Sequence, residues 1–350
     1  MHESRGFVGW SSRTKAALRF APLALAVGIL IFVFRGLDFS RLALLVRSRG
    51  PWLLVIVVPW GVVAALDAFA WRMLFLRISR GVSYLRLFGV RLSAEAVLMS
   101  VPSGSLVADG LTPHLLKTRC GVPVTEGLAC IAARKCLLGL GQALYLGLAS
   151  AVGYSAIRAT SAVTGMHAPE QALLGFALVL LLGSVVVARL LARGTLARFL
   201  QSLLLKVPSR RLRSFLREHA EGFEHTDAHL ARVFHGHVGT LAPPVAIYTV
   251  AWVIESLETF LILSLLGSGL RYPQVMPMEA TLATIRVMAF FVPAGLGIQD
   301  LGYVAFLKAL GVEDAVSLGA AFVLLKRAKE ASWIALGYLL LAKQPELKAP

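Results

Sequence analysis

The sequence predicts an all-α polytopic integral membrane protein with about six to eight transmembrane helices and two re-entrant hairpins in an inverted repeat. Three observations lead to this prediction: the composition, a series of long apolar runs, and two related apolar segments that proline and glycine interrupt. Hydrophobic residues make up 57% of the 350 residues and charged residues only 15%, whereas a soluble domain has about 25% charged residues. We therefore expect residues 1–350 to form a single transmembrane domain.

The apolar runs are long enough to cross a bilayer as helices, which takes roughly 20 residues. The clearest runs are 16–34, 52–70, 172–192, 238–266 and 315–341. Barrel strands would instead alternate in polarity over about ten residues. The first run follows basic residues but precedes no small-residue cleavage site, so we expect a retained helix and not a signal peptide.

The basic residues flank the apolar runs, where they set orientation and contact anionic headgroups. The net charge is +16, but no basic domain stands apart from the membrane, so we expect no nucleic-acid partner. The densest basic stretch predicts that residues 193–237 form a cytoplasmic linker with an amphipathic helix. The order of the spans places residues 35–50 on the side opposite to the cytoplasm, although this loop contains four arginines. Because basic loops favour the cytoplasmic side, the topology of this loop stays open.

Two apolar segments share a pattern of proline, glycine, aspartate and lysine. Residues 101–117 read VPSGSLVADGLTPHLLK and residues 292–308 read VPAGLGIQDLGYVAFLK, with six of 17 positions identical. The surrounding sequence predicts a first repeat unit at 86–152 and a second at 278–342. The basic residues place the two units in opposite orientations across the bilayer, which is the inverted-repeat plan of many transporters.

Each segment is expected to break a helix inside the membrane. Proline removes a backbone donor, and glycine permits turns that a Cβ would forbid. Such irregular backbone is tolerated at membrane depth only where protein buries it or where it lines a cavity. We expect a short helix from about 299 to 310 after the second break. The expected break residues are Pro102 and Gly104 in the first copy and Pro293, Gly295 and Gly297 in the second.

Both segments also place ionisable side chains within apolar sequence. Asp109 and Asp300 lie near the expected starts of the short helices, where a carboxylate caps exposed N–H groups. They serve either as caps alone or as caps with a role in substrate or proton handling. Lys117 and Lys308 follow eight residues later; each either extends to the membrane interface or binds a lipid phosphate.

The charges in the following helices need compensation from an acid, a cavity or an anionic ligand. We expect more cations than anions in this interior, which favours a phosphate-bearing headgroup over an uncharged lipid. The candidate lipid-binding and translocation residues are Pro102, Gly104, Asp109, Lys117, Arg134, Lys135, Pro293, Gly295, Gly297, Gln299, Asp300, Lys308, Lys326, Arg327 and Glu330. The candidate charge partners are Arg91 with Glu95 at i,i+4, Glu255 and Glu258 on one helix face, and Arg286.

The stretches SAEAVLMSVPSGSLVADGLTPHLLKTRCGV, FFVPAGLGIQDLGYVAFLKALGV and LLKRAKE resemble the flippase-like membrane domain of lysylphosphatidylglycerol synthases. PAGLGIQD looks most like its stand-alone members, some of which are associated with hopanoid biosynthesis. The resemblance implies a multi-pass protein of the bacterial inner (cytoplasmic) membrane that moves or handles lipids. The soluble aminoacyl-transfer domain of the synthases is not in this sequence, so we do not expect their enzymatic activity.

The expected function is flippase-like translocation of a phospholipid or related lipid. No Walker motif is present, so ATP is not the expected energy source, and no cofactor or metal is expected. One alternative is an accessory or scaffold subunit bound to lipid-biosynthetic enzymes. Another is a headgroup transferase that uses Asp109, Asp300 and His114 as acid–base groups. The lipid, the direction, the coupling ion and the oligomeric state stay open.

Overall fold

The computed structural model describes residues 40, 50–78, 81–158, 169–207, 210–218, 220–234, 238–288, 292 and 295–343. Within these residues the regular structure is helical and contains no strand, which confirms the all-α class. The expected first span at 16–34, nearly all of the loop at 35–50, and Pro293 lie outside the described residues.

The first group of helices ends and restarts at local signals. Proline near the start of α3 fits the first turn of a helix, where its missing N–H is not needed. α5 is terminated by the residue that follows it, Gly121, which adopts a left-handed conformation with φ of 67°. The elements are η1 (Gly50–Val57), α3 (Val58–Arg77), α4 (Tyr84–Ser100), α5 (Gly104–Cys120) and α6 (Val124–Val152).

The last group, like the first, consists of a short 3-10 helix followed by four α-helices. After η2 (Val238–Leu241) come α12 (Ala242–Leu265), α13 (Tyr272–Met288), α14 (Ile298–Ala309) and α15 (Ala315–Lys343). α6 and α15 are each 29 residues long. Between the two groups lie α8 (Pro169–Ala192), α9 (Leu196–Leu204), α10 (Arg210–Glu218) and α11 (Ala220–Phe234). The described residues of the region 193–237 thus form three short helices.

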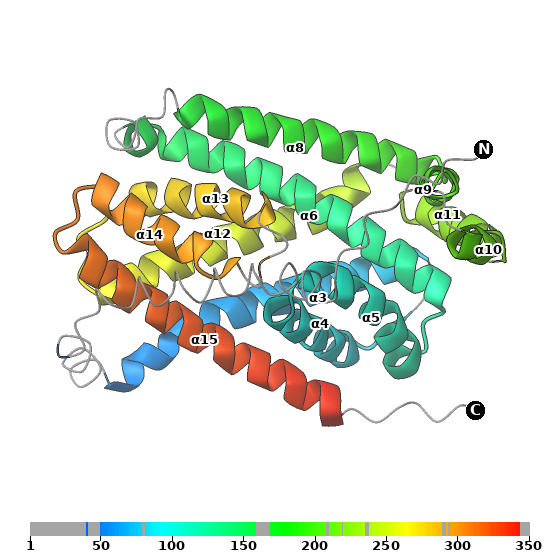
Figure 1. The fold of residues 1–350 in the computed structure, drawn as a ribbon, viewed down its shortest axis with the longest axis horizontal. Coiled ribbons are helices and arrows are strands. Elements are labelled where there is room, and N and C mark those ends of the chain that lie inside the picture. Colours follow the sequence, from blue (N-terminus) through cyan, green and yellow to red (C-terminus); the bar gives the residue numbers. More distant parts are fainter. Residues whose placement is uncertain are drawn as a thin grey trace, which may run out of the picture.

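Helices of each group pack against helices of the other group. α3 packs against α12, α4 packs against α15 of the other group, and α13 packs against α6. The α4–α15 contact is close because residue 337 is glycine: a Cβ there would lie 2.4 Å from the carbonyl oxygen of Leu92. In Figure 1, α13 and α14 occupy the left half of the molecule, and α4 and α5 the right half.

Among the described residues, four helices are long and apolar enough to cross a membrane: Leu54–Arg77, Val124–Val152, Gln171–Ala192 and Gly239–Leu265. Three of them match expected runs, whereas the helix from Val124 was not among the clearest runs. α15 is long enough, but four charged residues among the five from Lys326 to Glu330 interrupt its apolar sequence near the middle. A multi-pass membrane protein is supported, while the larger number of spans and the entry of the hairpins into a bilayer stay predictions.

Candidate functional site

The first helix break lies at residues 101–103, between α4 and α5. Ser103 has a φ of 53°, in the left-handed region. A Cβ on Gly104 would lie 2.2 Å from the carbonyl oxygen of Leu98, so only glycine fits this turn. Pro102 is exposed within it. Both predicted break residues of the first copy are therefore at the break.

The second break lies between α13 and α14. Gly295 and Gly297 have φ values of 65° and 79°, which favour glycine. The backbone N–H of Gly297 donates to Oδ2 of Asp300 at 2.8 Å, so Asp300 caps α14 as predicted. Asp109 does not cap α5, because this helix begins at Gly104 and Asp109 is its sixth residue. The capping expectation is wrong for Asp109.

Each short helix nevertheless uses its aspartate to bind the long helix that follows it. Asp109 forms an ion pair with Lys135 of α6. Asp300 accepts from Nη2 of Arg327 on α15 at 2.7 Å. The first pair is partly open, with side chains 35% and 48% exposed, whereas the second is closed, at 1% and 13%. The same link is therefore accessible in one half and buried in the other.

A group that we call the N-half cluster joins α3, α4 and α6. It consists of Asp67, Arg91, Glu95 and Arg134. Asp67 is paired with both arginines, and Nη1 of Arg91 donates to Oε2 of Glu95 at 2.5 Å, as the i,i+4 spacing predicted. The Arg134 guanidinium also lies over the ring of Trp71, 5.5 Å from its centroid. Asp67 was not among the predicted residues.

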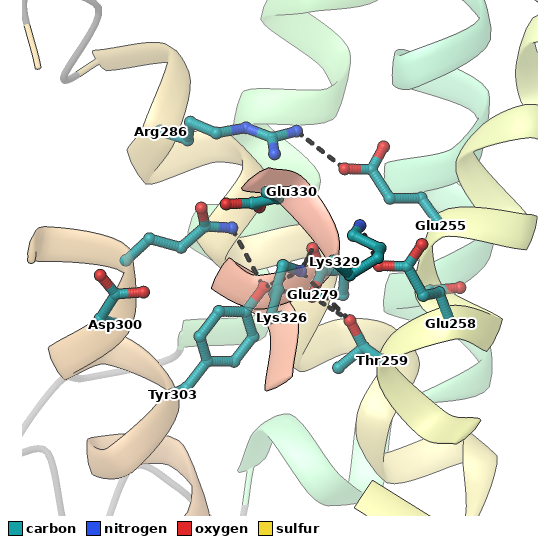
Figure 2. Close-up of polar contacts among 12 residues, drawn as sticks. Glu255, Glu258, Thr259, Glu279, Arg286, Asp300, Tyr303, Lys326, Lys329 and Glu330 are labelled. Atoms are coloured by element: carbon teal, nitrogen blue, oxygen red, sulfur yellow. Dashed lines mark hydrogen bonds and ion pairs between the residues drawn. The ribbon is translucent and has the colours of Figure 1, made fainter. Parts of the chain in front are cut away.

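A second group, the C-half cluster, joins α12, α13, α14 and α15 around Lys326. The Lys326 ammonium lies 2.7 Å from Oη of Tyr303 and 3.4 Å from Oε1 of Glu279. Oε2 of Glu279 accepts from Tyr303 at 2.6 Å and from Oγ1 of Thr259 at 2.8 Å. Nε2 of Gln299 lies 3.1 Å from the Tyr303 hydroxyl. Figure 2 shows these side chains converging from their separate helices.

Three further ion pairs complete the C-half cluster. Nζ of Lys329 donates to Oε1 of Glu258 at 2.6 Å, Nη1 of Arg327 donates to Oε2 of Glu330 at 2.5 Å, and Nη2 of Arg286 donates to Oε1 of Glu255 at 3.1 Å. The charged members of the cluster are Glu255, Glu258, Glu279, Arg286, Asp300, Lys326, Arg327, Lys329 and Glu330.

The expected excess of buried cations is wrong for these two clusters. The N-half cluster has two carboxylates and two guanidiniums. In the C-half cluster five carboxylates face four basic side chains. The expectation failed because it left out two acids, Asp67 and Glu279. An ionisable residue in an apolar run is a functional candidate by default, and this signal would have found both.

The two remaining predicted lysines differ from these buried groups in their exposure to solvent. Lys117 and Lys308 are exposed, each in the last turn of its short helix. A cation there is favoured by the C-terminal end of the helix dipole. Their exposure leaves the ammonium groups accessible to a ligand.

Comparison with known families agrees with this helical architecture. The family model for the lysylphosphatidylglycerol synthase TM region matches residues 19–325. No curated protein and no solved structure matches the chain. The family indicates a function related to membrane lipids. Because the match covers most of the 350 residues, the chain belongs to the family of the lysylphosphatidylglycerol synthase TM region.

Proposed function

We propose that this protein translocates lipids across a bacterial inner membrane, in the manner of a flippase and without ATP. The observation that carries the proposal is the pair of broken helices, α4–α5 and α13–α14, whose aspartates bind the long helices behind them. Broken helices that hold charges inside a bilayer mark the substrate path in many transporters.

An inverted repeat of re-entrant hairpins is the architecture that we propose for this path. The equal lengths of α6 and α15 support it. So does the exchange of partners, in which α4 packs on α15 and α13 packs on α6. In this architecture the hairpins enter the bilayer from opposite sides, and about six to eight helices cross it.

The unequal exposure of the two aspartate–base pairs suggests a cycle. Asp109–Lys135 is open and Asp300–Arg327 is closed. We propose that the opposite state closes the first pair and opens the second, as alternating access requires. A headgroup would then contact one hairpin at a time.

A phosphate-bearing headgroup is the proposed ligand class. In the paired state that the structure shows, the buried clusters do not supply the attraction, because their bases are already paired with carboxylates. The exposed Lys117 and Lys308 are better placed, since each can meet a phosphate without breaking an ion pair in either cluster.

Reconstitution tests this function. Purified protein in vesicles is expected to move labelled anionic phospholipid between leaflets, and Asp300→Asn is expected to slow this movement. Glu313→Gln is the matched control, because Glu313 is an exposed acid in the turn between α14 and α15. No protein-dependent movement of any phospholipid would contradict the proposal.

An accessory role in a lipid-biosynthetic complex is a second candidate, which α9 favours. This helix has no buried residue and exposes Phe199, Leu200, Leu203 and Leu204. Such a face suits a partner protein as well as lipid. The accessory role predicts that Asp300→Asn and Lys308→Ala leave the cellular phenotype intact while the complex still assembles. The transport role predicts a changed leaflet distribution with an unchanged set of lipids.

A further inference from the structure

One carboxylate of the C-half cluster is incompletely bonded. Glu258 lies on α12 and is 1% exposed. Its Oε1 accepts from Nζ of Lys329 at 2.6 Å. Its Oε2 is buried and has no hydrogen-bond partner among the described residues. A buried carboxylate oxygen without a donor disfavours the ionised form.

Glu279 shows what a fully bonded carboxylate looks like in the same cluster. Both of its oxygens are occupied, Oε1 by Lys326 and Oε2 by Tyr303 and Thr259. Asp300 likewise accepts from the Gly297 N–H and from Arg327. These bonds stabilise the ionised carboxylates. Of these three buried acids, Glu258 therefore receives the fewest hydrogen bonds to its carboxylate.

The net charge of the C-half cluster favours the binding of one proton. Five carboxylates face four basic side chains, and Arg327 is shared by Asp300 and Glu330. With every group ionised, the cluster carries one net negative charge. Adding one proton makes it neutral, which a site shielded from water favours.

The surroundings of Glu258 place this proton on it. α12 packs against α3, α6, α13 and α15 as well as η1 and η2, and the sequences of η1 and η2 contain no titratable side chain. The charged or titratable groups that interact within the surrounding cluster are Lys326, Lys329 and Glu330 on α15, Glu279, Arg286 and Tyr272 on α13, Glu255 on α12, Tyr303 on α14 and Tyr145 on α6. Asp67 on α3 and Arg134 and Lys135 on α6 belong to the ion pairs of the other half. Lys329 is its hydrogen-bonded partner, and the other bases bind other acids.

We infer that Glu258 is a proton-binding site that couples proton movement to the proposed lipid movement. A proton taken from water binds the Glu258 carboxylate and ends its ion pair with Lys329. The Lys329 ammonium is then released from the one hydrogen bond that the structure gives it. A released cation attracts a phosphate-bearing headgroup, so protonation and headgroup binding favour each other. Figure 2 shows Glu258 and Lys329 on facing helices.

Infrared difference spectroscopy tests the proton site without any transport. The full chain in lipid discs is titrated, and the carboxylic acid C=O band is followed. We expect the wild-type protein and the Glu313→Gln control to show a titrating band that Glu258→Gln loses. Lys329→Gln keeps Glu258 and is expected to hold the band to a higher pH, because the cation that favours the ionised form is gone. Absence of a titrating band in the wild type, or its persistence in Glu258→Gln, overturns the proton site.

Vesicle measurements test the coupling, which rests on the proposed function. Lipid movement by the wild type is expected to change between acidic and neutral pH, and Glu258→Gln is expected to lose this change. Lipid movement that is independent of pH in the wild type overturns the coupling. If the infrared band behaves as expected but no lipid moves, the proposed function fails while the proton site stands.

Discussion

The N-half cluster balances two carboxylates with two guanidiniums, whereas the C-half cluster sets five carboxylates against four bases. The bases also differ in kind. Arg91 and Arg134 stay charged in any protein environment, but the most buried bases of the C-half cluster are Lys326 and Lys329, each 3% exposed. Lysine changes its protonation more readily when it is buried.

This difference indicates a division of roles between the two halves. The N-half cluster is a fixed link between α3, α4 and α6, since neither of its bases loses its charge. The C-half cluster contains the incompletely bonded Glu258 and is the half that can change its charge. The aspartate–base pairs are opposite in exposure, with the open pair in the half that has the fixed link.

The largest expected effect tests whether the N-half cluster is a structural link. Asp67→Asn leaves Arg91 and Arg134 without the carboxylate that lies between them. Removing one partner of a buried ion pair costs about 3–5 kcal/mol, so thermal unfolding in detergent should show a large loss of stability. Combining it with Arg134→Gln should restore part of the loss, because one uncompensated cation is removed. A small loss for Asp67→Asn alone would show that the cluster is not a structural link.

The next effect tests the tight turn at the first helix break. Gly104→Ala forces a Cβ to within 2.2 Å of a backbone carbonyl oxygen, which cannot move as a flexible side chain can. Overpacking typically costs about 1–3 kcal/mol, and we expect the upper end from denaturant unfolding. Gly110→Ala in the same helix is the control, since nothing lies within 4 Å of a Cβ there. Equal stability of the two variants would contradict the tight turn.

The helix breaks could be predicted from sequence because their causes are local. Proline and glycine restrict the backbone wherever they occur, and the short helix expected near 299–310 is observed at Ile298–Ala309. The start of α5 was placed too late, because the left-handed Ser103 allows the helix to begin at Gly104. A non-glycine residue in that conformation has no clear sequence signal.

The clusters could be predicted only in part because their partners come from distant helices. Arg91 and Glu95 lie one turn apart, and the sequence was sufficient to pair them. Asp67 binds Arg134, which is 67 residues away, and Glu279 binds Lys326, which is 47 residues away. Such pairs depend on which helix faces pack together, and with helices apolar on most sides the sequence does not specify this.

A smaller effect contrasts the two aspartates. Asp300→Asn weakens the cap of α14, but Arg327 keeps its ion pair with Glu330 and is not left uncompensated, so we expect a loss of about 1–2 kcal/mol. Asp109→Asn is expected to cost below about 1 kcal/mol, because its pair with Lys135 is half exposed. Thermal unfolding of both variants measures the difference. A greater loss from Asp109→Asn would reverse the assignment of open and closed halves.

The smallest effect on stability concerns Lys117 and Lys308. Both are exposed at helix ends, and surface substitutions away from special features usually stay within about 0.5 kcal/mol. Replacing either with glutamine should therefore leave unfolding nearly unchanged, yet slow the movement of anionic phospholipid in vesicles more than that of zwitterionic phospholipid. Arg158, an exposed base beyond α6, provides the control as Arg158→Gln. Equal slowing of both lipids would mean that the lysines do not select the headgroup by its charge. The asymmetry between the halves would then lie in the buried clusters alone.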